Sequence, residues 1–103
     1  MSEILRGRVV VIGDRVNLPL FRSVGLEVEE AVGDERVIAE LERIAGRHDI
    51  SLVIILKHVV EDVDRVVEKA EELGIPTLIL PTLWAPAEKI NVERLLAKAL
   101  GLG

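Results

Sequence analysis

The stretch "VVVIGDRVNLPLFRSVGLE", residues 9–27, decides the fold, because it joins a buried strand, a turn and the start of a helix. The run at residues 8–12 is apolar after its first residue and stops at Gly13, as expected for a strand buried on both faces. Pro19 suits the first turn of a helix, which we expect to continue through Val24 and to end at Gly25. Many α/β proteins bind a phosphate at such a strand–turn–helix junction.

The rest of the chain repeats this alternation of strands and helices. Apolar residues form short continuous runs in the strands, and they recur at helical spacing between them. Residues 26–29 alternate between apolar and acidic side chains, which indicates a strand at the edge of a sheet. The expected strands are residues 26–29, 51–56 and 76–81, and the expected helices are residues 34–45, N-capped by Asp34, 59–73, and 91–100, N-capped by Asn91.

This order of elements predicts one α/β domain over residues 1–103. The crossovers are short, so we expect a parallel sheet built from right-handed units. The predicted architecture is a four-stranded parallel sheet of order 2-1-3-4, flanked by helices on both faces, a shortened flavodoxin-like or Rossmann-like fold. The composition agrees, because 50% of the residues are hydrophobic and only 2% are aromatic, which indicates an aliphatic core.

The default ligand position in such a sheet is the crevice at the carboxyl ends of the first and third strands. Gly13, Asp14 and Arg15 are expected on one side of it, and Lys57 and His58 on the other. The simplest interpretation of Asp14 opposite Lys57 is an ion pair at the mouth of the sheet.

Several kinds of site are excluded by the motifs that the sequence lacks. After Gly13 the next glycine is Gly25, so there is no dinucleotide fingerprint, and no Walker loop occurs. Pro19 removes one of the donors that a phosphate would use. His48 and His58 are the two histidines, and their spacing indicates no metal site. We therefore expect no catalytic residue, no cofactor and no metal.

The charge and the termini set further limits. The net charge of −5 argues against nucleic acid as a partner, because phosphate binding needs a clustered basic face. The absence of cysteine fits a reducing compartment. The first ten residues carry three charges and no long apolar run, so we expect neither a signal peptide nor a spanning helix there. The interpretation is a cytoplasmic protein.

The order of these segments resembles that of the F subunit of the archaeal and vacuolar-type (A/V-type) rotary ATPases. The resemblance covers residues 9–101 and includes "SLVIIL", "GIPTLILP" and "NVERLLAKALG". Its most specific part is Gly13-Asp14 followed by Phe21-Arg22 and Gly25, which is similar to a signature of that family.

The resemblance implies a non-catalytic component of the central rotor stalk. It implies binding to the coiled-coil D subunit of the stalk, a role in coupling or regulating ATP turnover in the catalytic head, and a place on the cytoplasmic side with only indirect membrane association. It also implies two interaction surfaces, residues 14–25 and the helix at 91–100. The interface candidates are Asp14, Phe21, Arg22, Trp84, Leu95, Leu96, Ala99 and Leu100.

Two alternatives stay open at the level of sequence. The leucine and alanine stripe of residues 91–100 also fits a helix packed on its own sheet. This helix is too short to be stable alone in water, so it is the element that we expect to move. As a different class of function, a small-ligand or nucleotide-responsive regulatory domain would use the crevice at Asp14, Lys57 and His58.

Overall fold

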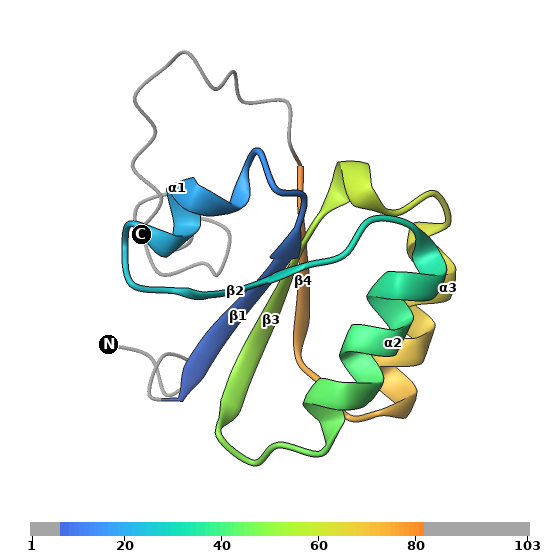
Figure 1. Ribbon diagram of the computed structural model, residues 1–103. Helices are drawn as coiled ribbons and strands as arrows, with labels where there is room; N and C mark the ends of the chain where they lie inside the picture. The colour runs from blue at the N-terminus through green and yellow to red at the C-terminus, as the bar shows by residue number, and fades with distance from the viewer. Residues whose placement is uncertain (1–6, 82–103) are drawn as a thin grey trace.

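The computed structural model describes residues 7–81 of the chain (Figure 1). Strands and helices alternate through this range, as the periodicity of apolar residues predicts. No helix within residues 7–81 has the length and apolar character needed to cross a membrane. The elements are β1 (Arg8–Gly13), α1 (Leu18–Arg22), β2 (Glu27–Glu30), α2 (Asp34–Ala45), β3 (Ile50–Leu56), the 3₁₀ helix η2 (Lys57–Val59), α3 (Val63–Glu72) and β4 (Thr77–Leu80).

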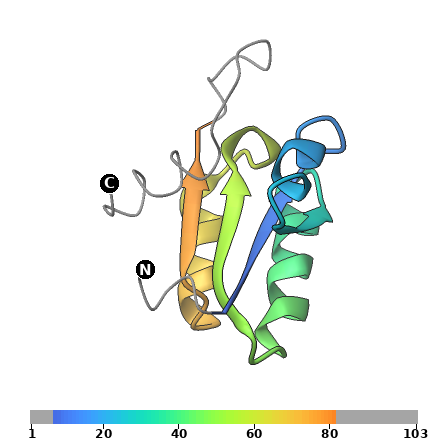
Figure 2. The same ribbon diagram turned by 90° about the vertical axis from the view of Figure 1, so that its left-hand side faces the viewer.

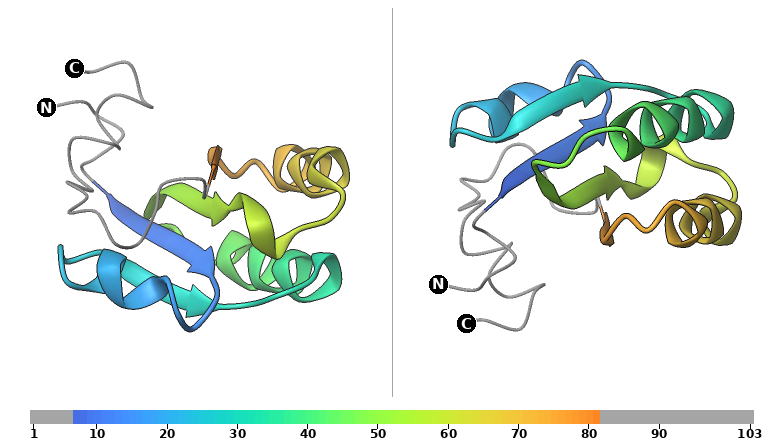
Figure 3. Two further views of the ribbon diagram at one scale, coloured as in Figure 1. Left: turned by 90° about the horizontal axis from the view of Figure 1, so that it is seen from above. Right: turned by 90° about the horizontal axis from the view of Figure 1, so that it is seen from below.

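The four strands form one parallel sheet of order β2-β1-β3-β4, which confirms the predicted fold. Figure 2 shows β3 between β4 and β1. Figure 3 shows α2 and α3 together on one side of the sheet and α1 on the other. Among the described elements, α1 is therefore the one helix on its face of the sheet.

Side chains of β1 and β3 alternate between the two faces, and both faces are apolar. Val10 lies opposite Val53 and packs toward α2 and α3, whereas Val11 lies opposite Ile54 and packs toward α1. All four side chains are fully buried. A strand that is covered on both sides needs apolar residues at every position, which explains the continuous runs in the sequence.

Gly13, the last residue of β1, is required by the packing around it. A Cβ atom at this position would lie 2.5 Å from Cδ1 and 2.9 Å from Cγ of Leu56, and 3.3 Å from Cδ2 of Leu18. Both leucines are buried in the core on the α1 face. A larger residue would push them apart, so the glycine allows β1 to run close to the end of β3.

The edge strand β2 carries three glutamates, and an arginine from another element pairs with each of them. Glu27 accepts hydrogen bonds from Arg8 at 3.2 Å and from Arg47 at 2.5 and 3.2 Å. The other two pairs are Glu29 with Arg43 of α2 at 3.1 Å and Glu30 with Arg15 at 3.4 Å. β2 is at the edge, as its alternating sequence predicts.

Two helix boundaries near the first loop differ from the sequence prediction. Helix α1 ends at Arg22 instead of Val24, and the chain turns at Gly25 with a φ of 90°. Asp34 is the first residue of α2, and the N-cap is Gly33, with a φ of 101°. The carboxylate of Asp34 accepts hydrogen bonds from the backbone N–H groups that precede α3 instead of capping its own helix.

Helix α3 begins four residues later than the predicted start at Val59. Val59 is the last residue of η2, and Val60 follows it. Both side chains pack into the core, although neither residue belongs to α3. The N-cap is Asp62, whose side chain accepts a hydrogen bond of 3.1 Å from the N–H of Arg65. The predicted helix at residues 91–100 lies outside the described residues.

Candidate functional site

Three loops meet at the carboxyl end of the sheet, where the crevice was expected. Backbone hydrogen bonds tie them together: the N–H of Ala31 donates to the carbonyl of Gly13 at 3.0 Å, and the N–H of Gly33 donates to the carbonyl of Val59 at 2.8 Å. These bonds join the end of β1 and the 3₁₀ helix η2 to the loop after β2. Backbone hydrogen bonds thus hold these segments together at the carboxyl end of the sheet.

Asp14 is the residue on which side-chain hydrogen bonds converge at this end of the sheet. Its Oδ2 accepts hydrogen bonds from the N–H groups of Val16 at 3.1 Å and Asn17 at 3.2 Å. The side-chain amide of Asn17 donates to both carboxylate oxygens, at 2.9 and 3.0 Å. Nε2 of His58 contacts Oδ1. The protein's own carboxylate therefore occupies the donors that a phosphate would use at this junction.

The hydrogen bonds to Asp14 also lower its pKa. Partial burial by itself raises the pKa, but the hydrogen bonds from Asn17 and His58 outweigh this effect, and the pKa of Asp14 lies below its ordinary value of 3.8. Asp14 therefore carries its negative charge throughout the neutral range. It is an acceptor held in place by donors, and in this state it is not a general acid.

The expected pairing of Asp14 with Lys57 is not formed. Asp14 contacts the next residue, His58, instead, because η2 turns the side chain of His58 toward the first loop. Lys57 is exposed. Arg15 pairs with Glu30 across the loops. Of the five crevice residues that the sequence indicates, Asp14 and His58 are in direct contact.

Asn17 is a part of this arrangement that sequence reasoning did not assign to the site. It binds Asp14 through both its backbone and its side chain. The signal in the sequence is an Asp followed three residues later by an Asn before a helix, a spacing that favours a turn closed by side-chain hydrogen bonds.

We name residues 14–25 the α1 segment. Phe21 is fully buried against the sheet, so it fixes the position of α1 and is out of direct reach of a partner. Arg22 is exposed and forms no ion pair with any residue in the range 7–81. Val16 is 82% exposed and Val24 is 38% exposed. The α1 segment therefore presents apolar side chains and one unpaired cation to solvent.

The remaining interface candidates, Trp84, Leu95, Leu96, Ala99 and Leu100, lie outside the described residues. Within residues 7–81, no three His, Asp or Glu side chains are grouped so that they could hold a metal ion.

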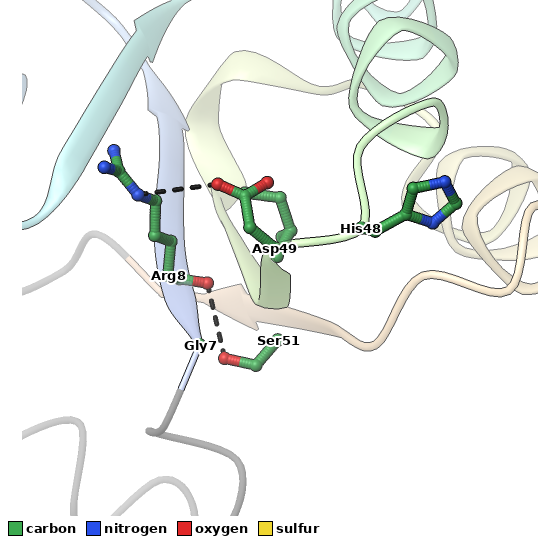
Figure 4. A pocket seen from close by; sticks show the side chains of 6 residues that line it. Gly7, Arg8, His48, Asp49 and Ser51 are labelled. Carbon is green, nitrogen blue, oxygen red and sulfur yellow. Dashed lines mark hydrogen bonds and ion pairs between the residues drawn. The ribbon is translucent and has the colours of Figure 1, made fainter.

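A second surface feature lies at the opposite end of the sheet. It is an open hollow of about 380 Å³ at the amino ends of β1 and β3. Figure 4 shows Arg8 beside Asp49, with a contact of 3.5 Å, while the ring of His48 points away from this pair. Ser51 donates a hydrogen bond of 3.3 Å to the carbonyl of Arg8. The groups in the hollow thus pair with one another, and they offer no cluster of free donors to a ligand.

Comparison with known proteins agrees with the resemblance described above. The family model for the ATP synthase (F/14-kDa) subunit matches residues 9–95. The V-type ATP synthase F subunits of two Clostridium botulinum strains, Eklund 17B (Type B) and Alaska E43 (Type E3), are each 24% identical to this chain over 98 residues. The alignments cover 92% of this chain and 94% of each relative. Because the family model spans most of the sequence, the chain belongs to the family of the ATP synthase (F/14-kDa) subunit.

Proposed function

We propose that this protein is a non-catalytic central-stalk component of a V-type ATP synthase. It binds the coiled-coil D subunit of the stalk and helps to couple or regulate ATP turnover in the catalytic head. The observation that carries the proposal is the family match, which extends from β1 through the whole sheet to residue 95. On this proposal the protein lies on the cytoplasmic side of the membrane and associates with it only through the complex.

The contacts at the crevice favour a protein that acts through its surface. Asp14 fills the position where an α/β enzyme or nucleotide-binding domain would hold an anion. A protein that acts through its surface needs an ordered framework and exposed side chains that a partner can contact. Backbone hydrogen bonds order the carboxyl end of the sheet, and the α1 segment carries exposed side chains.

We assign the proposed interface to the α1 segment and to the C-terminal residues at 84–100. Arg22 is the central candidate within the described part of the chain, because an exposed guanidinium without an ion pair can bind a carboxylate of a partner with two hydrogen bonds. Phe21 supports it from beneath. Trp84 and Leu96 are the corresponding candidates in the C-terminal part, as apolar anchors.

The test is a binding measurement between the full chain and the coiled-coil stalk protein of the same organism. Arg22→Glu should weaken binding about tenfold, which equals about 1.4 kcal/mol. Leu96→Asp, and removal of residues 89–103, should have a similar effect, because they introduce a charge into an apolar contact or delete that contact. Circular dichroism must show that each variant stays folded.

Arg36→Glu is the matched control. Arg36 is also exposed and without an ion pair among residues 7–81, but it belongs to α2, on the opposite side of the sheet from α1. Its replacement should leave the affinity unchanged. Equal losses for Arg22→Glu and Arg36→Glu would point to a general charge effect, and failure of the unaltered chain to bind would refute the proposal.

The alternative function, a ligand-responsive domain that uses the crevice, predicts that the isolated chain binds a nucleotide or a small ligand. Calorimetry with ATP, ADP and Mg²⁺ should give no heat of binding if the protein acts only through its surface. The purified chain should also hydrolyse no ATP. Turnover that survives purification and disappears in Asp14→Ala would overturn the non-catalytic assignment.

A further inference from the structure

Asp14 is held by two sets of donors that come from different parts of the chain. Val16 and Asn17 bind it from within its own loop, and His58 binds it across the sheet. The contact with His58 joins residues that are 44 positions apart in the sequence. It connects the start of the α1 segment to the 3₁₀ helix η2, which leads into α3.

The strength of this connection depends on the charge of the imidazole. A protonated His58 forms a charge-assisted hydrogen bond to the Asp14 carboxylate, which is about twice as strong as a bond between neutral partners. A neutral imidazole keeps the contact only in the tautomer that places its hydrogen on Nε2. The donors of Val16 and Asn17 are amide groups, which do not titrate, so His58 is the titratable donor to Asp14. The strength of the contact between Asp14 and His58 therefore changes when His58 gains or loses a proton.

The other charged groups around these loops are mostly engaged elsewhere. Lys57, the neighbour of His58 in η2, is exposed. Contacts with other partners hold the remaining groups: Arg15 binds Glu30, Asp34 accepts from the N–H groups of Glu61 and Asp62, and Glu35 binds Arg65. Among these described groups, Asp14 is the carboxylate in contact with the imidazole.

We propose that the contact between Asp14 and His58 is a latch that couples the protonation of His58 to partner binding by the α1 segment. The inference rests on the proposed function for the identity of that partner. The protonated latch fixes the first loop, and with it the exposed Val16 and the start of α1. A partner that binds the fixed loop then has a lower affinity when His58 loses its proton.

The coupling is reciprocal. If protonation of His58 raises the affinity for the partner, the partner must raise the affinity of His58 for its proton by the same factor. The Asp14 carboxylate remains ionised throughout the neutral range, because its pKa lies below its ordinary value of 3.8.

The latch itself is tested on the isolated chain by nuclear magnetic resonance. The ring signals of His58 and the amide signals of Val16 and Asn17 are followed between about pH 5 and 8. The two amide signals should shift with the same midpoint as the His58 ring. His48→Gln is the matched control, because His48 is exposed and its ring points away from its neighbours at the other end of the sheet.

The amide shifts should persist in His48→Gln and disappear in His58→Gln. Amides that do not respond in the unaltered chain, or that respond equally in His58→Gln, would overturn the latch. Circular dichroism of both variants excludes a loss of folding as the cause.

The coupling is tested by the affinity for the coiled-coil stalk protein at about pH 5.5 and 8. The unaltered chain and His48→Gln should bind about fivefold more weakly at the higher pH, and His58→Gln should lose this difference. The same pH dependence in all three proteins would overturn the coupling. Absence of binding at every pH would refute the proposed function and the coupling together, whereas the amide titration would still decide whether the latch exists.

Discussion

The carboxylate of Asp34, at the start of α2, accepts a hydrogen bond of 2.7 Å from the backbone N–H of Glu61, in the loop before α3. Its second oxygen accepts one of 3.2 Å from the N–H of Asp62. The side chain of Asp34 thus accepts hydrogen bonds from two backbone N–H groups that lie just before α3. It also holds the starts of α2 and α3 side by side, on the same face of the sheet.

Replacing Asp34 with alanine should lower the free energy of unfolding by about 1–2 kcal/mol, because two backbone donors lose their acceptor. Chemical denaturation measures the effect. Glu35→Ala is the control: Glu35 forms one exposed ion pair with Arg65, and such pairs contribute little. A loss for Asp34→Ala no larger than for Glu35→Ala would contradict the assignment.

Gly13→Ala should destabilise the protein by about 1–3 kcal/mol, because the new methyl group would overlap Leu56. Gly46→Ala is the matched control, since its Cβ would lie 3.6 Å from the nearest atom and its φ of −79° suits any residue. That substitution should be neutral or stabilise slightly. Thermal unfolding of the two variants compares them directly, and similar melting temperatures would show that β1 and Leu56 can move apart at little cost.

Ile54→Ala should cost about 2–5 kcal/mol, because Ile54 is fully buried on the α1 face of the sheet. Val32 is 53% exposed in the loop before α2, and Val32→Ala should change the stability by less than about 0.5 kcal/mol. Urea denaturation of both variants tests the prediction. An unchanged unfolding midpoint for Ile54→Ala would mean that β3 is not in the centre of the core.

The pair between Glu27 and Arg47 should make the stability depend on pH. The hydrogen bond from Arg47 lowers the pKa of Glu27 below its ordinary value of 4.5, more than burial raises it, and Arg8 adds to the lowering. The stabilisation is therefore present above pH 4.5 and is lost as the pH falls through the lower pKa of the folded state.

Glu27→Gln should accordingly be less stable than the unaltered protein at about pH 7, and the difference should be smaller at about pH 3. Urea denaturation at both pH values measures the difference. Glu42→Gln provides the comparison, because Glu42 forms only a 3.5 Å surface pair with Lys69. A difference for Glu27→Gln that does not shrink in acid would show that the charge of Glu27 is not its source.

The fold could be predicted from the sequence because β1, β3 and β4 are short apolar runs, the edge strand β2 alternates in polarity, and each crossover has room for one helix. The errors have a common physical origin. Val59 and Val60 continue the spacing of an apolar helix face, but they are buried from η2 and from the loop after it. Hydrophobic residues at these positions indicate that the side chains are buried. They do not show whether the backbone there forms an α-helix or a 3₁₀ turn. Asp62, the N-cap of α3, lies between Glu61 and Asp64, and the sequence alone does not show which of these acidic residues caps the helix.

The sequence predicted which loops meet at the candidate site, but it did not predict which side chains contact one another there. Asp14 was expected opposite Lys57, and the structure pairs it with His58. Which of two consecutive side chains faces the first loop depends on the turn that follows β3, and a single 3₁₀ turn decides it. Similarly, Asp34 has the residue type of an N-cap, yet its oxygens bind amides 27 and 28 positions away. Sequence spacing carries no information on such long-range partners.

The three glutamates of β2 and their arginine partners have a consequence for how the protein behaves in a concentrated solution. The outer edge of a sheet presents unpaired N–H and C=O groups, which can recruit a strand of another molecule and start aggregation. Charged groups lie along β2, because arginines pair with Glu27, Glu29 and Glu30. A strand that pairs with this edge would come close to these charges and desolvate part of them, which costs free energy. We therefore expect these charges to disfavour self-association at this edge, while the backbone of β2 stays paired with β1.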